Sequence, residues 1–112
     1  FIFGIAIAQA LSAGFVPVRK PGKLPRKVRA VDYSLEYGKD RLEIHADAIL
    51  HKRRVLVVDD LLATGGTLNA CCDMVRQAEA HIVGTAVLIE LLALKGRSRV
   101  EPYGSVHAVL QL

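Results

Sequence analysis

One stretch of the sequence changes character three times within thirteen residues, and it constrains the fold more than any other. Residues 55–58 form an unbroken run of Val and Leu, two aspartates follow at Asp59 and Asp60, and small residues continue to Thr67. Such an apolar run is typical of a parallel strand that is covered on both faces. Open α/β sheets bind ligands at the carboxyl ends of their strands, so we expect both aspartates to contact a ligand.

The small residues after the aspartates predict a loop that binds phosphate. Glycine has no Cβ, so the backbone can approach a ligand closely and turn successive amides toward it. A helix is expected at residues 67–78, and its N-terminus would add a positive dipole end to the same hollow. The loop is not a Walker A motif, because no Gly-Lys-Ser or Gly-Lys-Thr follows. The residues expected to bind the phosphate are Ala63, Thr64, Gly65, Gly66 and Thr67.

Two carboxylates directly before a phosphate loop would repel a bare triphosphate, but they suit a ribose. Asp59 and Asp60 can accept hydrogen bonds from the vicinal hydroxyls of a sugar whose 5′-phosphate lies in the loop. The alternative is an ordinary corner between a strand and a helix, with both acids facing solvent. We expect the ribose site, because a buried-type strand, two acids and a Thr-Gly-Gly-Thr sequence rarely occur together.

A second charged segment begins where another apolar run ends. Six of the eleven residues from 19 to 29 are basic, and Pro21, Gly22 and Pro25 disfavour a helix or a central strand there. A solvated surface loop is the simple interpretation. We expect instead that its first cations bind pyrophosphate, because they follow a buried strand expected at 15–19. These cations are Arg19, Lys20 and Lys23, whereas Arg26, Lys27 and Arg29 are assigned to solvent.

The composition limits the chain to one domain, residues 1–112, and indicates a folded α/β protein. Its 52% hydrophobic and 23% charged residues exclude a disordered chain. The net charge of +4 would attract acidic ligands but is too small to indicate nucleic-acid binding. The first eighteen residues carry no charge, yet Gln9, Ser12 and Pro17 interrupt them. We therefore expect a buried helix at 3–13, with no membrane span and no signal peptide.

The two cysteines predict reduced thiols in a cytoplasmic protein. Cys71 and Cys72 are adjacent in the expected helix, where neighbouring side chains diverge by about 100° and do not readily form a disulfide. The four histidines are scattered along the sequence, and no second pair of Cys or His stands at ligand spacing. We therefore expect no metal site built from protein thiols or imidazoles.

Three longer segments resemble one family of enzymes. They are Phe-Val-Pro-Val-Arg-Lys-Pro-Gly-Lys-Leu-Pro at 15–25, Tyr-Ser-Leu-Glu-Tyr-Gly at 33–38 and Leu-Glu-Ile-His-Ala-Asp-Ala-Ile at 42–49. The aspartates and loop at 59–67 resemble the phosphoribosyl-pyrophosphate (PRPP) loop of the type I phosphoribosyltransferases. The three segments narrow this resemblance to the adenine phosphoribosyltransferases. With Phe-Ile-Phe-Gly at 1–4 and Leu-Lys-Gly-Arg at 94–97, it covers nearly the whole chain.

The resemblance implies an α/β fold like that of the type I phosphoribosyltransferases, with a mostly parallel sheet flanked by helices and an inserted flap hairpin. The residue pattern predicts strands near 15–19, 55–59, 83–89 and 105–111, and hairpin arms at 33–37 and 41–48 with a turn at 38–40. In the family, a loop of this kind folds over the substrates and carries a glutamate and a tyrosine. These match Glu36 and Tyr37, which we expect to be catalytic; the alternative is an exposed hairpin pair.

The reaction implied by the resemblance is transfer of the 5-phosphoribosyl group from PRPP to N9 of adenine, which gives AMP and pyrophosphate in purine salvage. The family also implies Mg²⁺ bound mainly through PRPP and a homodimer in the cytoplasm, with neither nucleic acid nor membrane as a partner. Two alternatives stay open. One is a regulatory domain of the same fold that binds PRPP or a nucleotide without catalysis, and the other is a phosphoribosyltransferase for another base.

The start of the sequence leads to a further expectation about completeness. A parallel strand needs a crossover from an earlier strand, so the helix at 3–13 implies a strand before Phe1, beside the strand that holds Asp59. The family's N-terminal hood and the Arg-Gly that precedes Phe-Ile-Phe-Gly do not occur in the 112 residues. We therefore expect these residues to be the later part of a longer polypeptide, and to be aggregated, dimerised or inactive alone.

Overall fold

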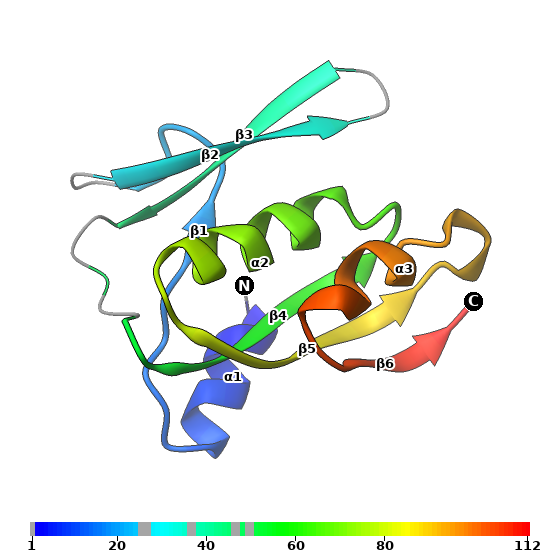
Figure 1. Ribbon diagram of the computed structural model, residues 1–112. Coiled ribbons are helices and arrows are strands. Elements are labelled where there is room, and N and C mark those ends of the chain that lie inside the picture. The colour runs from blue at the N-terminus through cyan, green and yellow to red at the C-terminus, as the bar shows by residue number, and fades with distance from the viewer. Residues whose placement is uncertain (1, 25–27, 36–37, 46–47, 49–50) are drawn as a thin grey trace.

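The computed structural model describes residues 2–24, 28–35, 38–45, 48 and 51–112, and it contains two sheets (Figure 1). The strands are β1 (Val18–Arg19), β2 (Val28–Leu35), β3 (Gly38–His45), β4 (Arg54–Leu62), β5 (His81–Glu90) and β6 (Val106–Gln111). The first three form an antiparallel sheet in the order β1-β3-β2. The last three form a parallel sheet in the order β4-β5-β6. The α/β fold with an inserted hairpin is therefore confirmed.

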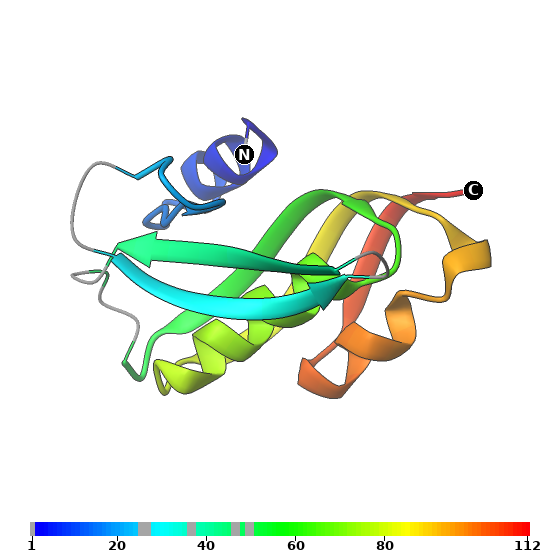
Figure 2. The same ribbon diagram turned by 90° about the horizontal axis from the view of Figure 1, so that it is seen from above.

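Two of the three helices in the described residues connect strands of the parallel sheet, and α1 (Ile2–Ala10) lies against β4. The other helices are α2 (Gly66–Gln77) and α3 (Arg97–Val100), and the short 3₁₀ turns η1 (Leu92–Leu94) and η2 (Glu101–Tyr103) flank α3. Parallel neighbours need a crossover connection. The crossover from β4 to β5 runs through α2, and the crossover from β5 to β6 runs through η1, α3 and η2. Viewed from above, α1 and α2 lie on opposite sides of β4 (Figure 2).

The main hydrophobic core lies between the parallel sheet and the helices α2 and α3. The side chains of Leu62, Cys72 and Val100 are fully buried at 0% exposure. Leu68, Cys72 and Val75 recur on the face of α2 that turns toward this core, whereas Arg76 and Gln77 on the last turn stay exposed. The remaining buried members of this core are Val57 and Val87. This core fixes the position of α2 relative to the carboxyl end of β4.

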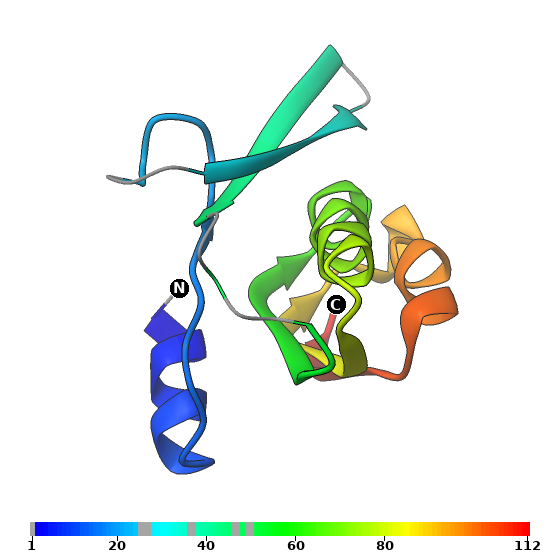
Figure 3. The same ribbon diagram turned by 60° about the vertical axis from the view of Figure 1, so that its left-hand side comes forward.

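The antiparallel hairpin packs mainly on the outer side of α2, and Val55 of β4 borders the cluster between them. Leu42 and Ile44 of β3 are buried against Ala70 and Met74 of α2. Figure 3 shows the hairpin above α2, with the parallel sheet on the other side of the helix. The hairpin is thus a separate layer over the helix that follows the loop at 63–65.

The expected helices and strands are close to those observed. The helices expected at 3–13 and 67–78 are α1 and α2, and the strands expected at 83–89 and 105–111 are β5 and β6. The expected end of a strand at Asp59 is wrong, because β4 continues to Leu62. Leu61 and Leu62 pair with Ile89 and Glu90 of β5, so three more residues extend the parallel ladder.

Two other details of the prediction are wrong. The strand expected at 15–19 in the parallel sheet is reduced to Val18–Arg19, which pairs antiparallel with β3. Its backbone groups are satisfied by the hairpin, and a cleft separates it from β4. The turn expected at 38–40 lies inside β3, because Gly38 already pairs with Leu35. Within the described residues, β4 pairs with β5 along one edge only, and the strand expected before Phe1 stays a prediction.

The apolar N-terminal segment forms only the nine-residue α1. None of the helices in the described residues is both long and apolar enough to span a bilayer. Large apolar side chains are exposed on α1 and just after it, including Ile2 at 76% and Leu11 at 63%. The expectation that this helix is buried is therefore wrong for the chain as described, in which α1 has no buried residue.

Leu62 provides a test of the core that supports the end of β4. We expect Leu62→Ala to lower the free energy of unfolding by about 2–5 kcal/mol, because it opens a cavity under the loop. Its neighbour Leu61, which is 42% exposed, is the matched control. Leu61→Ala should cost about 1 kcal/mol or less. Urea denaturation of both variants is the measurement, and equal losses would contradict this assignment of the core.

Candidate functional site

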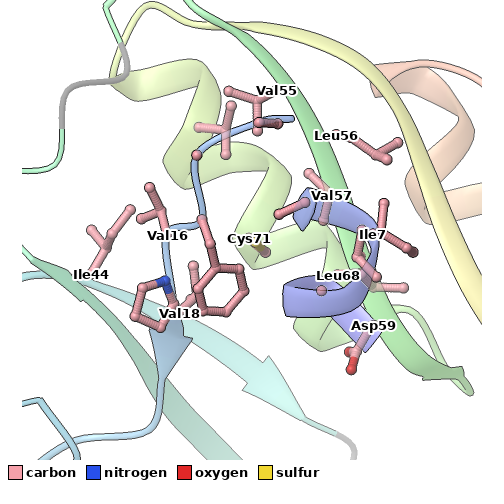
Figure 4. Close-up of a pocket in the computed structure, with 18 of the residues that line it drawn as sticks. Ile7, Val16, Val18, Ile44, Val55, Leu56, Val57, Asp59, Leu68 and Cys71 are labelled. Carbon is pink, nitrogen blue, oxygen red and sulfur yellow. The ribbon is translucent and has the colours of Figure 1, made fainter. Parts of the chain in front are cut away.

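A cleft of about 910 Å³ lies between α1, residues 13–20, β3, β4 and α2. Most of its lining is apolar, and Figure 4 shows Val16, Val55 and Leu68 among these side chains. Charged residues line the cleft at both ends of β4: Arg53 and Arg54 lie at its start, and Asp59 lies near its carboxyl end, with Arg19 and Lys20 at the end of β1. Asp59 therefore lies near the edge of the parallel sheet where such sheets bind ligands.

The two aspartates near the end of β4 occupy different environments. Asp59 is partly buried and lines the cleft, whereas Asp60 is exposed. The Asp60 amide donates a hydrogen bond of 2.8 Å to Oδ1 of Asp59. Burial raises the pKa of the Asp59 carboxyl, and the neighbouring Asp60 carboxylate raises it further. A hydroxyl donor or a cation beside Asp59 would favour its charged form, which is the demand that a ribose diol meets.

The segment between β4 and α2 has an open backbone. Residues 63–65 bend without forming a hydrogen-bonded turn, and Gly65 takes the left-handed conformation with φ 86°. Gly65 is also the N-cap of α2, which has no side-chain cap. In the described part of the chain, the amides of Gly65 and Gly66 donate no hydrogen bond. Open amides at the N-terminus of a twelve-residue helix form an anion-binding hollow.

The cations after residue 18 are only partly gathered at the cleft. Arg19 and Lys20 line it, together with Asp59 and Thr67. Lys23 does not belong to this lining, because the chain turns away through Gly22 at φ 78° and the Lys23 amide bonds the Lys20 carbonyl at 3.3 Å. The structure thus brings two of the three predicted pyrophosphate ligands to the cleft.

The predicted catalytic pair, Glu36 and Tyr37, lies outside the described residues. The described residues on either side, Leu35 and Gly38, pair with each other in β2 and β3. The two catalytic assignments therefore stay predictions.

One cluster beside the phosphate loop was missed in the sequence. Glu90, the last residue of β5, is only 3% exposed and pairs in register with Leu62, the last residue of β4. Arg97 donates hydrogen bonds to both carboxylate oxygens of Glu90. The Arg97 hydrogen bond holds the pKa of Glu90 below its usual value. The sequence signal was an acid that closes an apolar strand, which is the same pattern that singled out Asp59.

The cysteines and possible metal ligands can be placed as well. Cys71 and Cys72 are free thiols, as expected, and burial raises the pKa of Cys71 to about 12. Such a thiol stays protonated near neutral pH and is not a nucleophile. Across the described ranges, no group of three or more His, Cys, Asp or Glu side chains is arranged to hold a metal ion.

Comparison with known proteins agrees with this geometry. The chain is 55% identical over 111 residues to an adenine phosphoribosyltransferase of Rhodopirellula baltica, covering 99% of this chain and 53% of that protein. It is 57% identical over 109 residues to the same enzyme of Symbiobacterium thermophilum, covering 97% of this chain and 64% of that protein. The chain thus spans between about half and two thirds of the length of these curated relatives.

Solved structures show the same relationship. The adenine phosphoribosyltransferase of Rhodothermus marinus superposes with a TM-score of 0.95 at 53% identity, covering all of this chain and 64% of that one. The Saccharomyces cerevisiae enzyme, solved with an imino-altritol bisphosphate and adenine, gives 0.88 at 43% identity over 97% of this chain and 61% of that one. The family model for the phosphoribosyl transferase domain matches residues 1–111. The chain therefore belongs to the phosphoribosyltransferase family.

Proposed function

We propose that this chain forms the catalytic core of an adenine phosphoribosyltransferase, which transfers the 5-phosphoribosyl group of PRPP to N9 of adenine and releases pyrophosphate. The observation that carries the proposal is the partly buried Asp59, followed by open amides at the start of α2, in a chain more than half identical to adenine phosphoribosyltransferases. The product is AMP, and the physiological role is purine salvage.

The ribose 5-phosphate half of PRPP fits the segment from β4 to α2. The 5′-phosphate would bind in the loop at residues 63–67 and accept hydrogen bonds from the open amides of Gly65 and Gly66, and the dipole of α2 favours its negative charge. The ribose hydroxyls would donate to Asp59 and Asp60. Asp59 has its pKa raised by burial in the free protein, so bonding to the diol compensates a charge that is costly without a ligand.

The pyrophosphate half of PRPP fits the cations at the other side of the cleft. Breaking the bond at C1′ develops positive charge on the ribose and negative charge on the leaving pyrophosphate, so both need groups of opposite sign. Arg19 and Lys20, which line the cleft, would bind the pyrophosphate, and Lys23 would reach it from the turn beyond them. Glu36 and Tyr37 are proposed to act from the hairpin, with Glu36 stabilising the positively charged ribose.

Mg²⁺ fits the oxygen donors at this edge of the sheet. Asp59 and Asp60 are adjacent acids, and hard carboxylate oxygens are the ligands that Mg²⁺ accepts besides water and phosphate. Burial and the neighbouring Asp60 carboxylate raise the pKa of Asp59, so a cation beside it would favour its charged form. The metal would be held mainly by PRPP oxygens, with these two acids as its nearest protein groups. When bound, it neutralises charge on the pyrophosphate.

We also propose that the protein acts in the cytoplasm as a homodimer. Free Cys71 and Cys72 suit a reducing compartment. Exposed apolar side chains on and after the edge strand β6, such as Val109 at 63% and Leu112 at 70%, suit a covered surface.

The purified protein can be tested directly for AMP formation from adenine and PRPP, with hypoxanthine and guanine as competing bases. We expect AMP to form and the other two bases to react far more slowly. Binding of PRPP without turnover of any base would favour the regulatory alternative. Turnover of another base in place of adenine would favour a phosphoribosyltransferase of different specificity.

The ribose assignment predicts the effect of neutralising either acid. Asp59→Asn and Asp60→Asn should each lower kcat/KM for PRPP by more than about tenfold, because each removes a charge-assisted hydrogen bond worth about 1.5–3 kcal/mol. Asp73→Asn on α2, whose side chain bonds Gln77 and not the cleft, is the control. Steady-state kinetics that leave both site variants at the control value would rule out ribose binding by these acids.

The raised pKa of Asp59 also predicts that replacing this residue stabilises the protein although it impairs function. Its folded-state pKa is raised, so its contribution favours folding at low pH and is lost as the pH rises through the folded pKa. Above that pH the ionised carboxyl destabilises the ligand-free protein. Asp59→Asn should therefore be more stable than the wild type near pH 7, and the gain should shrink toward about pH 3. Urea denaturation across this range is the measurement, and a pH-independent difference would contradict it.

A further inference from the structure

The turn that follows β5 and η1 packs directly against the phosphate loop. A Cβ built on Gly96 would overlap the Ala63 carbonyl oxygen and lie 2.8 Å from the Gly65 nitrogen. A Cβ on Gly65 would lie 2.6 Å from the Gly96 carbonyl oxygen. The two backbones are therefore in contact with no room for a side chain between them. Gly96 has an ordinary φ of −64°, so close approach, and not backbone conformation, requires glycine there.

The loop has few other means of holding its shape. Residues 63–65 form no hydrogen-bonded turn, and α2 has no side-chain cap. Gly65 adopts φ 86°, which an unsupported loop can leave easily. The Asn69 amide donates to the Gly65 carbonyl at 2.8 Å, which ties the loop to the first turn of α2. The opposite side of Gly65 is in contact with Gly96.

Arg97 holds the turn in place through the ends of two strands. Its Nε lies 3.0 Å from Oε2 of Glu90, and its Nη1 donates to the Val106 carbonyl at 2.8 Å. The Nε2 of Gln111 in β6 donates to the same Glu90 carboxylate at 3.1 Å. One guanidinium thus joins the last residue of β5 to the first residue of β6 and to the start of α3. Glu90 in turn lies beside Leu62, from which the phosphate loop departs.

These contacts form a closed circuit. The loop leaves the end of β4 and contacts Gly96, and the next residue, Arg97, bonds Glu90. Glu90 is followed by Leu91, whose amide donates to the Leu62 carbonyl of β4 at 2.9 Å. Glu90 is buried, so its charge is stable there only while Arg97 stays in place. A lysine could supply the charge but not the paired geometry of a guanidinium.

We propose that Glu90 and Arg97 are positioning residues for the phosphate site, which hold the turn at 95–97 against residues 63–65 so that the loop amides stay open to a 5′-phosphate. The proposal rests on the proposed function, because that function places the 5′-phosphate in this loop. Neither residue belongs to the lining of the cleft. Their effect is therefore expected on binding of PRPP and AMP, and little on adenine.

Three variants of the full protein test this assignment. Arg97→Lys keeps the positive charge but loses the paired hydrogen bonds to Glu90. Glu90→Gln keeps the shape of the side chain but loses its negative charge. Gly96→Ala places a methyl group against the loop and leaves the hydrogen bonds between Glu90 and Arg97 intact. Each should raise the KM for PRPP and the Kd for AMP by about tenfold or more, with kcat at saturating PRPP and the KM for adenine changed by less than about threefold.

Two controls separate positioning from a loss of stability. Arg99→Lys makes the same chemical change at an exposed position two residues along α3 and should leave all constants unchanged. Val100→Ala removes a fully buried side chain from α3 and should lower the melting temperature without raising the KM for PRPP. If the three test variants only lower the melting temperature, as Val100→Ala does, the positioning role is wrong while the proposed function stands.

Amide hydrogen exchange gives a readout that needs no ligand. The Asn69 amide donates to the Gly65 carbonyl, so its exchange rate reports whether this hydrogen bond is formed. The rate should increase in Arg97→Lys and Gly96→Ala relative to Arg99→Lys. Unchanged exchange in both variants would overturn the proposal. A wild-type protein that binds neither PRPP nor AMP would contradict the proposed function instead. The exchange measurement would still show whether Glu90 and Arg97 hold the loop in place.

Discussion

The parallel pairing of β4 with β5 is the constraint on which the site depends. Its register places Asp59 opposite Val87 and Leu62 opposite Glu90, so both strands end together at one edge. The phosphate loop leaves β4 at that edge, and the turn containing Gly96 follows β5 from the same place. A shift of this register would separate Gly96 from the loop, because the two backbones are in direct contact and no side chain could bridge a larger distance.

The local parts of this arrangement could be predicted from the sequence. The apolar run before Asp59, the glycines before α2 and the basic residues after Val18 each act through near neighbours, so their patterns carry the information. The α/β class, α2, β5 and β6 followed from such patterns. The expected convergence of Asp59 and Thr67 with Arg19 and Lys20 at one cleft is also observed, but not for the expected reason, because β1 belongs to the antiparallel sheet.

The errors concern contacts between segments that are distant in sequence. Strand pairing with β5 extends β4 past Asp59, and pairing with β3 draws Val18 and Arg19 into the antiparallel sheet. Neither partner is visible in the local pattern. The contact between Gly65 and Gly96 joins residues thirty-one positions apart, and a basic sequence such as Lys-Gly-Arg-Ser-Arg reads locally as a solvent-exposed connection. The pairing of β4 and β5 is what brings residues 95–97 next to the loop at 63–65.

Burial near one edge of the sheet has opposite energetic consequences for two acids, the buried Glu90 and the partly buried Asp59. Glu90 meets Arg97 and Gln111 within the protein, and these hydrogen bonds lower its pKa, so its charge is compatible with the folded chain alone. Asp59 accepts a hydrogen bond from the Asp60 amide, but burial raises its pKa. The first acid is satisfied by the fold and can hold a turn in place. The second is left undersatisfied by the fold, and hydrogen-bond donors of a ligand would complete it.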